Sequence, residues 1–294
     1  MKEWMKGLPD TIKLSQINLA GTHNSGAFKV KFSFFSKCQN MTIAEQLNSG
    51  LRFFDIRVEK LGDELKLVHA IADCKNPEKP TKPLLLRSVV KTFKKFLAEN
   101  PSEVILFSFN RDDGAGSEET FDLFFEKYLS DDALWYKENR IPTLKEVRGK
   151  IVLLNRCHID KSNENYTDMN TGVNLSNWVY QKDNTERIYE RAELLGRDNS
   201  LTGKSFMVQD LYGLTPQKKW SLAIEPFIKN PPESEDILIS FFSCISALYN
   251  PRSSAGYINK RLAGVTLENT KKYGWIILDY PTTDFIKKVI DSNF

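Results

Sequence analysis

Residues 17–26 read INLAGTHNSG, an apolar run that ends in a histidine and continues in small, turn-forming residues. The run predicts a strand over residues 16–20, so His23 stands just beyond its carboxyl end. A second histidine, His69, closes the run LKLVH in the same way. Side chains at the carboxyl ends of strands project from the edge of a sheet, where barrel enzymes build their sites. Because the chain has only three histidines, two in this setting indicate a common site.

Two further strand-like runs end in charged side chains. LRFFDIR ends in Arg57, and WIILD ends in Asp279. Two imidazoles and a guanidinium supply a base, an acid and a fixed cation, a set that suits phosphodiester chemistry. In a barrel the first and last strands are neighbours, so we expect the Asp279 carboxylate to hold His23 by its other ring nitrogen. Without these other strand-end residues, His23 would be interpreted as a turn residue that follows a strand.

The remaining pattern alternates strands with helices. Strands are predicted over residues 16–20, 52–57, 65–69, 104–109, 151–155, 206–209, 236–242 and 275–279. Helices are predicted over residues 41–49, 84–99, 117–128, 184–195, 216–229 and 256–272. About eight strands in mostly βα order favour a closed parallel barrel over a doubly wound sheet. The short connection between strands 52–57 and 65–69 indicates an antiparallel pair or a distorted barrel.

Composition excludes several classes of protein. The 294 residues carry a formal charge of +3, so no nucleic-acid partner is expected. No run approaches the roughly 18 apolar residues of a membrane span, and no signal-peptide core follows the first residues. We therefore expect a soluble protein, cytoplasmic as given and secreted if a leader peptide has been removed. The four cysteines lack metal-ligand spacing and are expected to be free thiols.

The motifs GTHNSGAF, LRFFDIR, VHA, VRGKIVLLNR, VQDLY, GYIN and GWIILDY together resemble the bacterial phosphatidylinositol-specific phospholipase C family, the X-domain phosphodiesterases. The resemblance runs in order from about Trp4 to the carboxyl terminus. It implies one catalytic domain over residues 1–294, an α/β fold of the distorted or incomplete TIM-type barrel kind. It also implies cleavage of phosphatidylinositol to diacylglycerol and inositol 1,2-cyclic phosphate without a metal or other cofactor.

The resemblance also assigns roles to residues. It makes His23 the general base that takes the proton of the inositol 2-hydroxyl, with Asp279 as its partner. It makes His69 the general acid and places Arg57 on a phosphate oxygen. The sugar would be held by three further side chains: Arg156, Asp210 and Tyr212.

The chain departs from the family pattern at three positions. Asn24 stands where the bacterial enzymes have an aspartate that supports the acid. Asn110 and Asp112 stand where they have an inositol-binding lysine and glutamate. We include all three among the candidate site residues and expect the affinity for the head group to differ.

Asn24 also suggests a calcium-dependent relative, because the eukaryotic X domain has His-Asn at this place. Calcium takes about 6–8 oxygen ligands, usually several carboxylates. Asp55 is the one acidic match here, while Arg57 and Asn110 occupy the other two acidic positions. A fixed cation in the metal's place favours a metal-independent site, with Asp55 kept as a candidate catalytic residue.

The segment KVKFSFFSK (residues 29–37) supports two interpretations. Phe32, Phe34 and Phe35 either insert into a membrane interface beside lysines that meet anionic head groups, or form core beneath a loop. The first interpretation fits a peripheral, monomeric enzyme whose partner is phosphatidylinositol in a bilayer. Glycosylated forms of this lipid are possible substrates.

Three alternatives compete with this enzyme. One is an inositol-lipid-binding module whose turnover is weakened or lost through Asn24 and Asn110; the retained histidines, Arg57 and Asp279 argue against it. Another is the calcium-dependent phosphodiesterase considered above. The last is a glycerophosphodiester hydrolase, which would need a His-Arg-Gly start and a carboxylate cluster that the sequence lacks.

Overall fold

The computed structural model describes residues 1–111, 116–129, 133–234 and 236–294, so Asp112 lies outside the described residues. The strands are β1 (Leu19–Thr22), β2 (Phe53–Leu61), β3 (Glu64–His69), β4 (Ala72–Asp73), β5 (Ile105–Arg111), β6 (Trp135–Tyr136), β7 (Ile151–Asn155), β8 (Val173–Asn174), β9 (Glu190–Leu195), β10 (Leu201–Gln209), β11 (Ile237–Phe241) and β12 (Trp275–Leu278).

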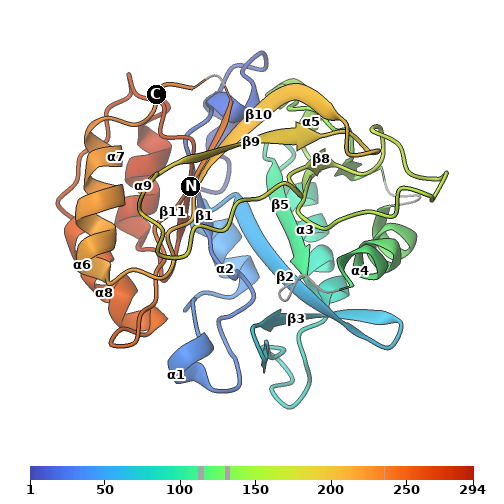
Figure 1. The fold of residues 1–294 in the computed structure, drawn as a ribbon, viewed down its shortest axis with the longest axis horizontal. Coiled ribbons are helices and arrows are strands. Elements are labelled where there is room, and N and C mark those ends of the chain that lie inside the picture. The colour runs from blue at the N-terminus through green and yellow to red at the C-terminus, as the bar shows by residue number, and fades with distance from the viewer. Residues whose placement is uncertain (112–115, 130–132, 235) are drawn as a thin grey trace.

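The helices are α1 (Ser33–Ser36), α2 (Ile43–Asn48), α3 (Leu86–Glu99), α4 (Ser117–Phe124), α5 (Leu144–Val147), α6 (Pro216–Lys219), α7 (Glu225–Lys229), α8 (Pro251–Leu262) and α9 (Thr283–Asp291). Short 3₁₀ turns cover Trp4–Gly7 and Leu14–Gln16, and π-helical turns cover Phe125–Leu129 and Trp220–Ile224. Helices α6 to α9 gather at the left of the view in Figure 1, and α3 and α4 lie at the right. No helix of the described residues has the length and apolar character needed to cross a bilayer.

The strands form one sheet in the order β6-β7-β5-β2-β1-β12-β11-β10-β9. Neighbours are parallel from β6 to β10, and β9 joins antiparallel at the edge. The alternation of strands and helices and the pairing of first with last strand are confirmed. The closed barrel is not, because no strand ladder among the described residues joins β9 to β6 or β8.

One predicted helix is wrong, and another has different bounds. The first contains β9, in which Ala192 and Leu194 are buried while Arg191 and Glu193 point outward. This two-residue alternation is a strand pattern, but the helix-forming Glu, Ala and Leu obscured it. The second, predicted over residues 256–272, begins earlier, at Pro251, and ends at Leu262; the C-cap Ala263 and then Gly264 follow. Glycine just past a helix is a common stop signal.

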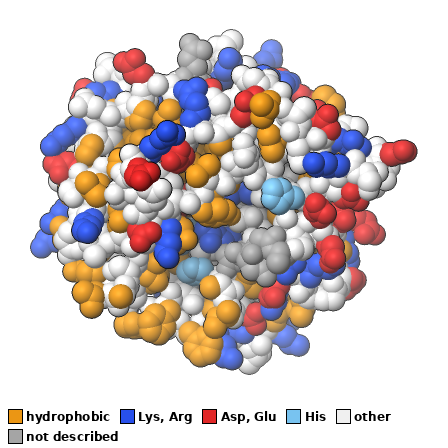
Figure 2. Space-filling model, in the orientation of Figure 1, with side chains coloured by type: hydrophobic (Ala, Val, Ile, Leu, Met, Phe, Trp, Pro, Cys, Tyr) orange, Lys and Arg blue, Asp and Glu red, His pale blue; other side chains and the backbone are white. Residues whose placement is uncertain are grey.

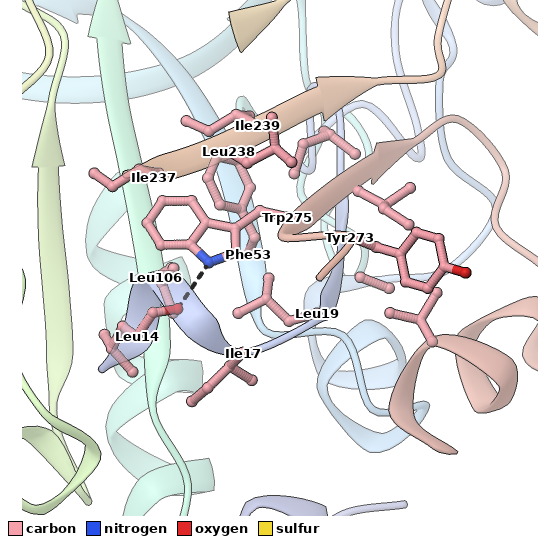
Figure 3. Close-up of a cluster of buried hydrophobic side chains, with 14 of the residues drawn as sticks. Leu14, Ile17, Leu19, Phe53, Leu106, Ile237, Leu238, Ile239, Tyr273 and Trp275 are labelled. Carbon is pink, nitrogen blue, oxygen red and sulfur yellow. Dashed lines mark hydrogen bonds between the residues drawn. The ribbon is translucent and has the colours of Figure 1, made fainter. Parts of the chain in front are cut away.

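A layer of buried hydrophobic side chains fills the interior near the amino-terminal ends of the strands, below the carboxyl ends. Trp275 packs against Phe53 and Leu106, and its indole Nε1 donates to the Leu14 carbonyl at 3.2 Å (Figure 3). At the amino-terminal ends of β2 and β5, Arg52 Nη2 pairs with Glu103 Oε2 at 2.7 Å, and both side chains are buried. Arg52 therefore has a structural role, unlike the second arginine of LRFFDIR.

Candidate active site

Alternate residues of a strand point to the same face of the sheet, and this two-residue period positions the side chains of the site. Phe53, Asp55 and Arg57 share one face of β2, so this face changes from apolar to charged along the strand. The register pairs Asp55 with Ser108 and Arg57 with Asn110 on β5, where the same face changes from apolar to neutral polar. The polar side chains therefore lie in layers above the hydrophobic core, toward the carboxyl ends of the strands.

His23 and Asp279 follow the same rule on the first and last strands. Thr22 pairs with Leu278 in the parallel register, so the next residue of each strand lies side by side. His23 Nδ1 donates to Asp279 Oδ1 at 2.9 Å, which keeps the ring proton on Nδ1. Gln39 Nε2 binds the carbonyls of both His23 and Leu278, at 2.7 and 3.1 Å, and so ties the two strand ends together.

Small residues are required in the turn that carries His23. A Cβ atom on Gly21 would come within 2.5 Å of Phe53 Cβ, and one on Gly26 within 2.4 Å of Leu67 Cδ2. Asn24 adopts a left-handed backbone with φ of 43°. Its Nδ2 donates to His23 Nε2 at 3.0 Å, while its Oδ1 is buried without a partner. Asn24 thus contacts the expected base, not the expected acid.

His69 reaches the site by a different route from the one expected. Strand β2 does not end at Arg57 but continues to Leu61, and β3 returns antiparallel to it. This hairpin brings His69 back to the rim, where its Nδ1 donates to the Ser36 carbonyl at 2.7 Å. The two imidazole centroids are 5.7 Å apart at 83°. The two rings are thus held by different acceptors, His23 by a carboxylate and His69 by a neutral carbonyl.

Asp55 is fully buried beneath these rings and anchors the arginines. Its Oδ2 accepts Arg57 Nε at 3.2 Å and the Asn24 backbone N–H at 3.1 Å, and its Oδ1 accepts Arg156 Nη1 at 3.4 Å. Burial raises the pKa of Asp55, but the charges of Arg57 and Arg156 outweigh this and hold the pKa below its usual value. An ionised Asp55 therefore fixes the Arg57 guanidinium in place.

A cavity of about 860 Å³ opens above this cluster. Its lining includes His23, His69, Arg57, Asp279, Asp210, Tyr180 and Tyr212. Figure 2 shows this face hollowed near its centre, with basic side chains in the hollow and a histidine beside it. Most of the predicted residues thus face one space.

Arg156 and Asn110 lie under the lining of this cavity. The guanidinium of Arg156 is fully buried, 3.9 Å from the Trp178 ring centroid, and its Nη2 donates to the Tyr180 hydroxyl at 3.2 Å. Asn110 Nδ2 donates to the same hydroxyl at 3.2 Å. Asp210 is held by Trp178 Nε1 at 3.1 Å, and Tyr212 is partly exposed. Trp178 and Tyr180 were missed, although two aromatic residues stand close together in a polar stretch.

Lys219 is a second missed residue, on α6 behind Asp210. It is fully buried, and its Nζ donates to Gln209 Oε1 and the Leu211 carbonyl, on either side of Asp210. Burial lowers the pKa of Lys219 to about 8, although the Cys244 thiol and the Asp210 and Asp279 carboxylates oppose the change. The ammonium group braces the strand end that presents Asp210.

The lowered pKa predicts a pH dependence of stability. Above pH 8 the folded chain loses this proton, whereas the unfolded chain keeps it to pH 10.5, so unfolding takes up a proton and stability rises. Relative to Lys219→Met, the wild-type free energy of unfolding should gain about 3 kcal/mol between pH 7.5 and 10.5. Urea denaturation of both proteins across this range measures the difference. A constant difference would show that Lys219 is not desolvated.

The comparisons with known proteins agree with this geometry. The family model "Phosphatidylinositol-specific phospholipase C, X domain" matches residues 12–157. A 1-phosphatidylinositol phosphodiesterase of Staphylococcus aureus (strain Newman) is 29% identical, with 99% of this chain and 94% of the relative covered. One from Listeria monocytogenes is 25% identical, with 99% and 85% covered. The chain belongs to the phosphatidylinositol-specific phospholipase C family.

A solved structure shows that the fold is shared. The phosphatidylinositol-specific phospholipase C of S. aureus, from a structure concerned with its membrane binding, has a TM-score of 0.77 and 26% identity, and 100% of this chain and 97% of that one are covered. The L. monocytogenes enzyme has a TM-score of 0.67 at 22% identity, over 100% and 98%. The open sheet of this chain is thus an incomplete TIM-type barrel, as the sequence predicts.

Proposed function

We propose that this protein is a phosphatidylinositol phosphodiesterase that forms diacylglycerol and inositol 1,2-cyclic phosphate. The observation that carries the proposal is the pair of differently held imidazoles, His23 and His69, on one cavity beside Arg57. The match over residues 12–157 covers one part of the site, and Asp279 comes from the last strand. We therefore propose that residues 1–294 form a single catalytic unit.

The first half of the proposed reaction is proton removal and ring closure. His23 Nε2 takes the proton of the inositol 2-hydroxyl. Its Nδ1–H remains hydrogen-bonded to Asp279, whose charge stabilises the imidazolium that forms. The hydroxyl replaces the Asn24 amide as the donor to Nε2. Its oxygen then bonds to the phosphorus of the neighbouring ester, an intramolecular step favoured by proximity.

The second half is departure of the glycerol oxygen. As the bond between this oxygen and phosphorus breaks, His69 Nε2 gives the oxygen a proton. The Nδ1–H of His69 remains hydrogen-bonded to the Ser36 carbonyl. Arg57 stabilises the charge on the non-bridging phosphate oxygens. The inositol hydroxyls contact Asp210, with Tyr212 against the ring face. They also displace the Tyr180 hydroxyl from Arg156 and Asn110.

A direct assay tests the proposed function. Incubation with phosphatidylinositol vesicles should produce inositol 1,2-cyclic phosphate, followed by phosphorus NMR, and phosphatidylcholine vesicles should yield no product. Binding to phosphatidylinositol without any cyclic phosphate would support the lipid-binding module instead. Failure both to bind and to cleave the lipid would contradict the assignment.

We also propose that the monomeric protein contacts the bilayer through α1. Phe32, Phe34 and Phe35 are 57%, 65% and 64% exposed, which rules out the interpretation that they form core. Their segment carries Lys31, whose Nζ lies 5.1 Å from the Phe32 ring centroid. Apolar side chains gather along the edge of the molecule that carries α1 (Figures 1 and 2). Inserted rings with nearby lysines suit an anionic membrane surface.

Replacing Phe34 and Phe35 by Ser should weaken binding to anionic vesicles by roughly 10²–10⁴-fold, because each Phe contributes about 1.5–3 kcal/mol when fully inserted, or about 3–6 kcal/mol for the pair. Sedimentation with vesicles measures the binding. Leu201→Ser is the matched control, since Leu201 is 70% exposed at the start of β10, away from the carboxyl ends of the strands. Equal vesicle binding by the double variant and wild type would remove α1 from the interface.

A further inference from the structure

Three potential metal ligands of different chemistry meet at the floor of the site. One ligand atom each from His23, Cys38 and Asp279 lies within 4.8 Å of the others. They come from the ends of β1 and β12 and from the segment after α1. Cys38 is fully buried, and its Sγ lies 3.5 Å from His69 Nδ1. Nothing in the proposed reaction uses this thiol.

The backbone holds the three residues in a fixed arrangement. The Tyr280 N–H, next to Asp279, donates to the Cys38 carbonyl at 2.9 Å, and the Cys38 N–H donates to the Ala27 carbonyl at 3.0 Å. Gln39 joins the same segment to His23 through the bond described above. A metal therefore meets ligands that are already ordered, and each needs to shift by about 1 Å or less to reach the bond lengths of roughly 2.0–2.3 Å that zinc forms with N, O and S.

We propose that these residues form an inhibitory site for zinc or cadmium, a soft divalent cation bound by His23, Cys38 and Asp279. Thiolate, imidazole and carboxylate are the donors that zinc selects, and three protein ligands leave a fourth position for water from the cavity. Calcium is excluded because it requires more oxygen ligands. The inhibitory effect rests on the proposed function; the binding does not.

Metal binding releases one proton and moves a second one. The S–H bond of Cys38 breaks as the metal–sulfur bond forms, and one proton leaves to solvent. The ring proton of His23 moves from Nδ1 to Nε2, so Nδ1 can bind the ion. The Asn24 amide can accept this Nε2–H after rotation, which gives its partnerless Oδ1 a hydrogen bond. The base nitrogen is then blocked and Asp279 is occupied by metal.

The charges nearby permit a cation to bind. Arg57 repels it, and Asp55, which holds that guanidinium at 3.2 Å, offsets only part of its charge because Asp55 also pairs with Arg156. The carboxylate of Asp279 and the thiolate created on binding supply two negative charges for the ion. Access is through the cavity, which His23 and Asp279 line.

The test measures both binding and inhibition on the full chain. Cadmium titration should produce one thiolate-to-metal absorbance band per chain, and equilibrium dialysis should find one zinc per chain. Zinc should inhibit phosphatidylinositol cleavage, and a chelator should restore it. Cys38→Ser should keep its basal rate, lose the absorbance band and need at least about tenfold more zinc for inhibition. Cys157→Ser, a buried thiol outside the cluster, is the matched control and should behave as wild type.

Circular dichroism and Cys38→Ala guard against a folding defect in the serine variant. Equal zinc sensitivity of the Cys38 variants and wild type, or absence of the thiolate band in wild type, would overturn the site. A chain that binds one cadmium through Cys38 but never cleaves phosphatidylinositol would uphold the site and refute the proposed function.

Discussion

Replacing His23 or His69 by Ala should reduce the rate of phosphatidylinositol cleavage by roughly 10²–10⁴-fold, the contribution of a positioned acid or base. Both side chains line the cavity, and their rings bond to Asp279 and to the Ser36 carbonyl rather than to the core. Loss of either ring therefore removes a proton carrier with little effect on folding. Initial rates of cyclic phosphate release measure the effect.

The chain offers a matched control in its third histidine. His158 is exposed, and its backbone N–H donates to Ser117 Oγ. His158→Ala should keep the wild-type rate and stability. If the His23 and His69 variants also kept near wild-type rates, the acid–base assignment would be wrong. The double variant should lose little more than one single variant, since the two rings act in one step.

Asp279→Asn separates the chemical from the structural role of the carboxylate. The amide keeps the shape, but its oxygen carries no charge to stabilise the imidazolium. Its rate should fall while its melting temperature stays close to that of wild type. Lost stability with retained specific activity would make Asp279 a strand-end cap instead.

Much of the site could be predicted because parallel strands impose simple geometry. Residues at the carboxyl ends of neighbouring strands meet at one edge, which brings His23 beside Asp279. The two-residue period then places Asp55 and Arg57 on the inward face of β2. These relations need only the strands and their order, both of which leave local signals in the sequence.

The other features depend on tertiary contacts that have no local signal. His69 returns to the rim because the β2–β3 hairpin extends beyond it and folds back, and the sequence alone left the direction of that pair open. Tyr180 lies between β8 and β9, outside any regular element, and its hydroxyl is placed by Arg156 and Asn110. Strand β9 is extended because it pairs with β10, against the helix preference of its residues.

The open edge of the sheet also depends on tertiary contacts that have no local signal in the sequence. The sequence indicates strands, but whether the first and last members of a ladder meet depends on the segments between them. Residues 175–189 lie between β8 and β9 without forming a strand that bridges the two. Their aromatic side chains are used instead to cover Arg156, so the same segment that leaves the barrel open completes the wall of the cavity.

Arg57→Ala should lose most of the activity, and wild-type activity should survive an excess of chelator. The guanidinium carries a permanent charge and presents a rigid fork of donors to phosphate, so it can supply the charge that a metal ion provides in metal-dependent relatives. Asp55 is the acidic residue best placed to hold calcium, but its two oxygens already accept hydrogen bonds from Arg57, Arg156 and the Asn24 backbone. We expect a loss of roughly 10²–10³-fold, the effect of removing one charge-stabilising donor from a transition state.

Calcium should not restore the Arg57→Ala variant, because Asp55 and Asn24 supply too few oxygen ligands for it. Arg57→Lys keeps the charge but not the fork, so it should recover only part of the rate. Rates with and without chelator, then with added calcium or zinc, distinguish the cases. A metal-independent enzyme with the inhibitory cluster keeps or gains activity in chelator and loses it only in zinc. Wild-type activity that chelator abolishes and calcium alone restores would make Asn24 a calcium ligand and place this chain with the metal-dependent enzymes.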